Sequence, residues 1–182
     1  MVNKKRLVRL TQELIRINSE NPPGDESGIA RYVQDYLRKL GLRPRIYEFK
    51  KKRPNVLATL KGSNPKRSLL ITPHLDTVPA GRSWKINPFS GRIKNNRIYG
   101  LGATDCKCNI ASALEAINSI IEEKGILDYT LIFAATADEE SGSEFWLSRD
   151  NSAYDGSRAH ISSTSLWVGS GHCLLRQYGA PA

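Results

Sequence analysis

The sequence has few of the features that mark secreted, membrane-spanning or disulfide-stapled proteins. It contains only 3 cysteines, and Cys106, Cys108 and Cys173 follow neither a disulfide nor a zinc-finger spacing. No apolar run approaches the roughly 18–20 residues of a membrane span. The basic start at residues 4–6 continues as an amphipathic helix rather than as a signal peptide. These absences predict a globular protein of the reducing cytoplasm with no membrane partner.

The length and composition describe an ordinary globular chain. Hydrophobic residues make up 40% and charged residues 25% of the sequence, which is typical of a folded domain with its own core. A chain of 182 residues corresponds to one ordinary domain or to a larger domain that has been cut short.

Positive charge is concentrated near the N-terminus. The formal net charge is +9, and residues 1–67 hold 17 Lys and Arg against 6 Asp and Glu. The densest run, residues 50–53, has no aromatic residues among its charges. A solvated turn is the favoured interpretation, and a phosphate-binding patch is the alternative. Since no recognition motif accompanies the run, we expect no nucleic-acid partner.

Apolar residues recur at helical spacing in some segments and form strand-like runs in others. The pattern predicts an α/β fold with a mixed, mostly parallel sheet between helices. Helices are expected over residues 4–18, in a second segment that ends before Gly41, and over Cys108–Glu123. Strands are expected at Arg45–Phe49, Val56–Leu60, Leu69–Thr72 and Thr130–Ala135, with a small hairpin around Asn95 and Asn96.

Histidine and acidic residues follow the ends of predicted elements at three places. His74 comes two residues after one predicted strand, and Glu139 and Glu140 follow another. Asp105 lies in a glycine-containing loop ahead of a helix. Ligands of open α/β sheets bind beyond the carboxyl ends of the strands, so we expect these segments to meet at one sheet edge. An imidazole and several carboxylates there indicate a metal-dependent hydrolase.

Each of these groups has an ordinary structural explanation when it is taken alone. A His-x-Asp sequence such as His74 to Asp76 is more often a hydrogen-bonded pair than a ligand set. Asp105 alone would be an N-cap, and the acidic run at residues 138–140 would be solvated charge at a helix end. The coincidence of all three at element ends favours the metal site.

Longer strings around these residues resemble one family. The strings are PHLDTVP at residues 73–79, YGLGATDCK at 99–107 and ADEESG at 137–142, with NPPG at 21–24 and WKINPFSG at 84–91. In order and spacing, from about residue 5 to 144, they resemble the M20 metallopeptidases, the group of acetylornithine deacetylase, succinyl-diaminopimelate desuccinylase and carboxypeptidases. The resemblance implies the catalytic domain of a zinc-dependent exopeptidase.

The same resemblance implies a site with two zinc ions and a role for each residue. His74 would bind one ion, Asp105 would bridge both ions, and Glu140 would bind the second. Asp76 would hold the tautomer of the His74 imidazole. Glu139 would take a proton from the bridging water and pass it to the leaving amine. Cobalt or manganese are expected substitutes for zinc, and the peptide after Asp105 is expected to be cis.

Three positions depart from the family pattern. Leu101 stands where the family usually has arginine, and Cys108 where it usually has glycine. Cys106 replaces a typically apolar residue, a place that a small buried thiol can fill. Thiolate ligation by Cys106 and Cys108 is the less favoured alternative, because successive positions beside Asp105 point in different directions.

The resemblance stops after residue 144, and the sequence changes character there. No sustained helical or strand period is found from Phe145 to Ser170. Residues 1–144 are therefore assigned to the N-terminal part of the catalytic domain. Residues 145–182 are expected to be an aberrant, poorly ordered tail, produced by a shifted reading frame or an internal deletion.

Family members are about twice as long and carry a lid domain, through which they often form homodimers, and further metal ligands after this point. The resemblance therefore implies a truncated catalytic domain that lacks the lid. Where a further acidic ligand is due, the sequence offers only Asp155 and His160.

Two functions stay open. The first is a metal-dependent amidohydrolase or peptidase of the M20 type, which hydrolyses an N-acyl amino acid or a small peptide with a metal-bridging water. The second is a non-catalytic, truncated remnant with at most partial metal binding. The expected partner is a small-molecule substrate, whose identity would depend on the lid and later segments.

Overall fold

The central sheet has four strands in the part of the chain that the structure describes. A computed structural model describes residues 1–144 in full, and residues 164–169 and 172–177 by their backbone. The strand order is β1 (Arg45–Glu48), β2 (Pro54–Leu60), β6 (Thr130–Ala135) and β3 (Ser68–Ile71). β1 pairs with β2 and β2 with β6 in antiparallel fashion, whereas β3 runs parallel to β6.

The sheet is mixed, as the sequence predicts, but one of its three described pairings is parallel rather than most of them. The connection from β1 to β2 explains part of this difference. Only residues 49–53 separate the two strands, and a parallel crossover needs a dozen residues or more. The short connection therefore makes a hairpin.

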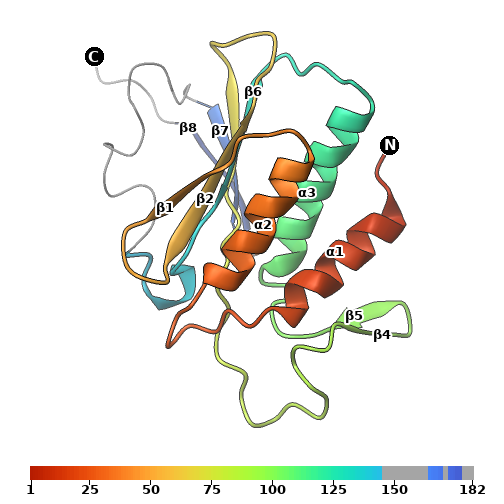
Figure 1. Cartoon of the computed structure of the whole chain (residues 1–182), viewed down its shortest axis with the longest axis vertical. Coiled ribbons are helices and arrows are strands. Elements are labelled where there is room, and N and C mark those ends of the chain that lie inside the picture. Colours follow the sequence, from red (N-terminus) through yellow and green to blue (C-terminus); the bar gives the residue numbers. More distant parts are fainter. Residues whose placement is uncertain (145–163, 170–171, 178–182) are drawn as a thin grey trace.

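Three helices pack on one face of this sheet: α1 (Lys4–Arg16), α2 (Ser27–Lys39) and α3 (Lys107–Glu122) (Figure 1). The core between the helices and the sheet consists of buried aliphatic side chains and one phenylalanine. From the helices it includes Leu10, Leu14, Val33, Leu37, Ile110, Leu114 and Ile117, and from the strands Val56, Ala58, Leu131, Phe133 and Ala135. In the described part of the chain the helices thus cover one face, whereas helices on both faces were expected.

Local sequence signals account for several element ends. The Asn3 side chain caps α1 by accepting a hydrogen bond from the Arg6 backbone N–H at 3.1 Å. Gly41 ends the α2 segment with a φ of 82°, a left-handed conformation that glycine adopts at low cost. Asn95 and Asn96, with φ of 50° and 57°, turn the predicted hairpin between β4 (Arg92–Lys94) and β5 (Arg97–Tyr99).

A second hairpin lies beyond residue 144. Strand β7 (Thr164–Gly169) pairs antiparallel with β8 (His172–Gln177), and β7 lies beside β3. No regular element was expected between Phe145 and Ser170, because the short apolar stretch Leu166–Val168 is too brief to show a period. The remainder of the predicted tail, including Asp155 and His160, lies outside the described residues.

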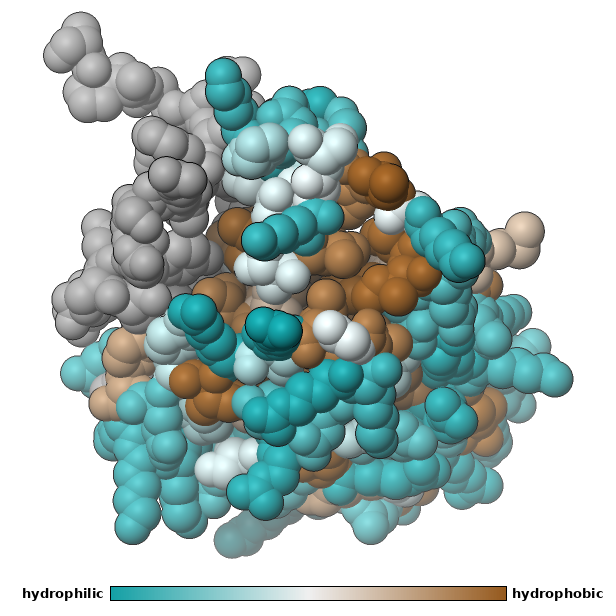
Figure 2. All heavy atoms as spheres, turned by 45° about the horizontal axis from the view of Figure 1, so that its top comes forward, coloured by the Kyte–Doolittle hydropathy of each residue, from teal (hydrophilic) through white to brown (hydrophobic). Residues whose placement is uncertain are grey.

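Figure 2 turns toward the viewer the end of the sheet opposite the carboxyl ends of β3 and β6. Hydrophilic side chains cover most of this view, and apolar side chains lie among them at several places. Within residues 1–144, none of the helices has the combination of length and apolar character that crossing a bilayer requires. The expected cytoplasmic location stays a prediction.

Candidate metal centre

The parallel pairing of β3 with β6 places the carboxyl ends of both strands at one edge of the sheet. An isolated parallel bridge between His74 and Thr136 continues this register beyond the strands, and the Leu75 backbone N–H donates to the Thr136 oxygen at 2.7 Å. Glu139 and Glu140 follow in the short 3-10 helix η1 (Glu139–Ser141). The structure therefore brings the histidine and the acidic pair to the same edge.

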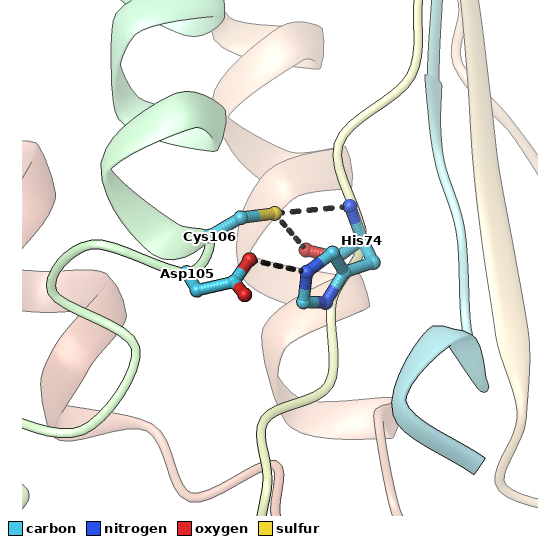
Figure 3. A group of neighbouring side chains, drawn as sticks. All are labelled: His74, Asp105 and Cys106. Atoms are coloured by element: carbon cyan, nitrogen blue, oxygen red, sulfur yellow. Dashed lines mark hydrogen bonds and ion pairs between the residues drawn. The ribbon is translucent and has the colours of Figure 1, made fainter. Parts of the chain in front are cut away.

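His74 is buried, with 3% of its surface exposed, and both ring nitrogens are engaged. Figure 3 shows the contact of the ring with Asp105. Nε2 lies 2.9 Å from Asp105 Oδ1. Nδ1 lies 2.9 Å from the backbone oxygen of Asp76 and 3.5 Å from its Oδ1. Burial lowers the pKa of His74, but the contacts with Asp76, Cys106 and Asp105 outweigh burial and raise it. The contacts of Nδ1 with Asp76 fix the orientation of the ring. Nε2 therefore faces Asp105 and is the nitrogen placed to bind a metal ion.

Asp76 is fully buried and holds the turn that carries the acidic pair. Oδ1 accepts from the Glu139 backbone N–H at 3.1 Å, and Oδ2 accepts from the Glu140 backbone N–H at 3.0 Å. The Asn21 side-chain amide donates to Oδ2 at 2.9 Å. Burial raises the pKa of Asp76, but the hydrogen bonds from His74, Asn21 and the Glu140 backbone hold it below its usual range. An ionised Asp76 thus links the histidine to the acidic turn.

Glu139 and Glu140 are half-buried and lie close to the histidine. Glu139 Oε2 is 3.8 Å from His74 Nε2. One atom from each of the three side chains fits within 4.8 Å of the others. Burial raises the pKa of Glu140, and the negative charges of Asp105, Glu139 and Asp76 raise it further against the opposing effect of His74. Such a concentration of negative charge is relieved by a bound cation.

Cys106 is buried, as expected of a small thiol in an apolar place, and it lies beside this group. Its Sγ, together with His74 and Asp105, forms a second cluster of potential ligand atoms within 4.8 Å. The sulfur, however, accepts from the His74 backbone N–H at 3.2 Å and donates to the His74 oxygen at 3.3 Å (Figure 3). Burial raises the pKa of the Cys106 thiol. This arrangement favours a protonated thiol that supports the histidine backbone rather than a thiolate ligand.

The donor set fits a divalent metal ion. It offers one imidazole nitrogen from His74 and carboxylate oxygens from Asp105, Glu139 and Glu140, which are ligand types that zinc, cobalt and manganese accept. The peptide bond between Asp105 and Cys106 is cis, as the family resemblance implies.

A buried arginine beside the site escaped the sequence prediction. Arg53 is 6% exposed, although the basic run 50–53 was interpreted as a solvated turn. It contacts Glu26, Asn21 and Asp138, which are also buried. The residue types of the basic run do not show which member is buried. The one indication of burial was the position of Arg53 directly before the strand that starts at Pro54.

Lys107, the last residue of the YGLGATDCK string, is also fully buried. Its Nζ donates to the Ile17 backbone oxygen at 2.6 Å. Burial lowers the pKa of Lys107 to about 8, against the opposing charge of Glu20. Lys107 therefore ties the start of α3, next to Asp105, to the end of α1.

Comparison with known proteins connects this centre to a family. The profile of Peptidase family M20/M25/M40 matches residues 70–174. A deformylase from Halalkalibacterium halodurans, which acts on N-formyl-4-amino-5-aminomethyl-2-methylpyrimidine, is 31% identical over 182 residues, covering 97% of this chain and 41% of the deformylase. Succinyl-diaminopimelate desuccinylase from Pelagibacter ubique is 34% identical over 139 residues, covering 73% of this chain and 35% of the relative. The chain thus spans less than half the length of these relatives.

Solved structures show the same fold. An M20 family metallo-carboxypeptidase from Sulfolobus solfataricus superposes with a TM-score of 0.69 and 29% identity, over 75% of this chain and 32% of the carboxypeptidase. Aminopeptidase PepT from Bacillus cereus gives a TM-score of 0.72 and 27% identity, over 93% of this chain and 44% of PepT.

Proposed function

Because this chain belongs to Peptidase family M20/M25/M40, we propose that it carries the N-terminal part of a metal-dependent site for amide-bond hydrolysis. The observation that carries the proposal is the convergence of His74, Asp105, Glu139 and Glu140 at one sheet edge. The family relatives are hydrolases and peptidases by name. The chain spans 41% of the deformylase and 35% of the desuccinylase. Hydrolytic activity of the chain is therefore proposed together with the site.

The proposed ligands divide between two zinc sites. His74 and Asp105 belong to the first, and Asp105 and Glu140 belong to the second. The contact of 2.9 Å between His74 Nε2 and Asp105 Oδ1 supports the first pair. Bound zinc would polarise the scissile carbonyl and acidify the attacking water.

Glu139 is the proposed general base. Its carboxylate is half-buried and faces the histidine at 3.8 Å, while its backbone N–H is held by Asp76. Glu139 accepts a proton from the attacking water as the new C–O bond forms, and returns it to the nitrogen as the C–N bond breaks. The products are a carboxylic acid and an amine.

The proposed substrates are N-acyl amino acids or small peptides. The names of the relatives support this class, since they include a deformylase, a desuccinylase and peptidases. All of these reactions cleave an amide bond to a small acyl or aminoacyl group.

A non-catalytic chain with partial metal binding is the second candidate. The residues described in full supply three proposed ligands, His74, Asp105 and Glu140, and the bridging carboxylate would be shared. A catalytic zinc site ordinarily has three protein ligands for each ion. With two ligands at each proposed site and Asp105 shared, the described part of the chain supplies fewer ligands than two ions require.

Metal binding and hydrolysis test the proposal separately. Zinc and cobalt bound to the purified chain are counted by equilibrium dialysis and elemental analysis, and we expect well under two ions per chain. Hydrolysis is assayed with N-succinyl-diaminopimelate, N-acetylornithine and a dipeptide. If hydrolysis is found, Glu139→Gln should lower kcat by about 10²–10⁴-fold with metal binding retained, while Glu144→Gln serves as the exposed control.

The outcomes separate the two candidates. Two tightly held zinc ions, or hydrolysis that depends on Glu139, would exclude the non-catalytic candidate. Binding of metal without hydrolysis would favour it. The proposed site would be contradicted if no metal bound, or if replacing His74 and Asp105 left metal binding unchanged.

A further inference from the structure

A buried arginine lies behind the acidic turn and contacts three other segments of the chain. Arg53, directly before β2, donates from Nη1 to Glu26 Oε1 at 2.7 Å. Its Nη2 donates to Asn21 Oδ1 at 3.0 Å and to Asp138 Oδ1 at 2.5 Å. All four residues are at most 6% exposed. Burying charges away from water costs free energy, which only well-placed ion pairs and hydrogen bonds offset.

The backbone around the guanidinium leaves room for it. Gly24 has a φ of 79°, and a Cβ added there would lie 1.7 Å from Arg53 Nη1 and 2.2 Å from its Cζ. A side chain at Gly24 is therefore incompatible with the observed position of Arg53. The NPPG string at residues 21–24 thus contributes Asn21 as an acceptor and Gly24 as space.

Asp138 is the partner that connects Arg53 to the acidic turn, which carries Glu139 and Glu140. Its φ of 70° is left-handed, a conformation that residues other than glycine adopt when their surroundings impose it. Oδ2 of Asp138 accepts from the Glu144 backbone N–H at 2.9 Å, and its backbone oxygen accepts from the Ser143 N–H at 2.7 Å. Asp138 therefore closes the loop that contains Glu139 and Glu140, while its Oδ1 is held by Arg53.

A second connection runs through Asn21. Its amide nitrogen donates to Asp76 Oδ2 at 2.9 Å and to Asp138 Oδ1 at 3.1 Å. Because Arg53 donates to the oxygen of the same amide, the amide orientation is fixed. Asp76 in turn accepts the backbone N–H groups of both glutamates of the turn.

We propose that Arg53 is a positioning residue of the metal centre, which holds Asp138 and the Asn21 amide and thereby fixes the turn that presents Glu139 and Glu140. Arg53 acts through these two neighbours, to which its Nη2 donates. The inference rests on the proposed function, because the turn matters for catalysis only if the glutamates serve the metal site. The order of the turn itself can be measured without an activity assay.

Arg53→Lys is the principal test. Lysine keeps the positive charge but has no planar fork that reaches Glu26 and Asp138 together. Affinity for Co²⁺ is measured on the purified chain by titration of its visible absorption, and supporting residues of metal sites typically contribute about 10–100-fold in affinity. We expect a loss of that size in the variant. Hydrogen exchange of the peptide covering residues 137–144 should be at least about tenfold faster.

Two controls separate positioning from general stability. Arg67→Lys alters an exposed arginine, paired with Asp128, and should leave both measurements unchanged. Leu37→Ala removes a fully buried core side chain of α2 and destabilises the chain without touching the turn. Both readings are taken well below the melting temperature of each variant.

Equal Co²⁺ affinity and equal exchange of residues 137–144 in Arg53→Lys and the wild type would overturn the inference. So would a loss of affinity that Leu37→Ala reproduces. If the wild-type chain binds no Co²⁺, the proposed metal site fails, and the exchange measurement alone decides whether Arg53 orders the turn. If Arg53→Lys does not fold, Asn21→Ala removes the second connection while keeping the ion pairs, and the same two changes are expected of it.

Discussion

His74 Nε2 lies 2.9 Å from Asp105 Oδ1, although 31 positions separate the two residues in the chain. The contact joins the end of β3 to the start of α3. The loop before Asp105 is compact, since a Cβ on Gly102, whose φ is 76°, would approach the Thr77 methyl carbon to 2.8 Å. Packing therefore determines the separation of the two proposed ligands before any ion binds.

Asp105→Asn should weaken metal binding without unfolding the chain. The amide keeps the size of the side chain and its contact with His74, but it removes the negative charge that attracts the cation. We expect affinity for Co²⁺ to fall at least about tenfold, or ~1.4 kcal/mol, in an absorption titration. Asp128→Asn, at an exposed site on the opposite end of β6, is the control. Unchanged affinity in Asp105→Asn would remove Asp105 from the ligand set.

Glu26→Gln should change how stability depends on pH. Burial, opposed by the charge of Arg53, raises the pKa of Glu26 from 4.5 to about 7, and its Oε2 has no hydrogen-bond partner in the described part of the chain. The folded chain then binds this proton more tightly than the unfolded chain. The stabilisation from protonated Glu26 is complete below pH 4.5 and is lost as pH rises through about 7.

The free energy of unfolding of Glu26→Gln should therefore rise relative to the wild type between these pH values, by up to ~3 kcal/mol. Urea unfolding at several pH values measures it. Asp35→Asn, an exposed change in α2, should give a curve parallel to that of the wild type. A parallel curve for Glu26→Gln as well would show that Glu26 is ionised across the whole range.

Gly62→Ala should be strongly destabilising. A Cβ at this position would lie 2.0 Å from the Tyr129 backbone oxygen and 2.8 Å from the Leu127 oxygen, so the connection after β2 would have to move away from the start of β6. Backbone displacements of this kind cost about 1–3 kcal/mol or more. Gly81→Ala is the matched control, because its nearest neighbour would be Ser83 Oγ at 3.9 Å. Equal melting temperatures for the two variants would contradict the close approach.

Arg6→Gln should destabilise the chain more than Arg9→Gln, although both residues lie in α1. Arg6 pairs through Nε with Glu115 Oε2 at 2.5 Å, and Glu115 is 1% exposed. Removing the partner of a buried carboxylate costs about 3–5 kcal/mol. Arg9 makes an exposed pair with Glu13 at 3.7 Å, worth about 0.3–0.5 kcal/mol. Chemical denaturation distinguishes these values readily.

The sequence predicts the position of the site better than the network around it. His74, Glu139 and Glu140 were expected at one sheet edge because each comes a few residues after the end of a strand, and apolar runs in the sequence mark where those strands end. Arg53 was not, because its burial depends on Glu26 and Asp138, which lie 27 and 85 positions away. Nothing within a basic run shows which of its members meets distant carboxylates.

Sheet geometry was predicted only in part for a similar reason. The strands β2, β3 and β6 lie within two residues of the expected bounds, since their limits depend on local composition. Their order and direction depend on which strands pair, and pairing is decided by packing over long sequence separations. The hairpin β4–β5 was the exception, because two asparagines are sufficient to specify its turn.

The register between β3 and β6 has a consequence for how this protein tolerates change. Leu69 aligns with Leu131 and Ile71 with Phe133, and these apolar side chains face the helices. A slip of one residue would turn them to the opposite face and would carry His74 about 3.3 Å along the strand. Any substitution that shifts the alignment of these hydrophobic pairs therefore also moves His74 relative to the other proposed ligands. The packing of the core thus sets the geometry of the metal centre.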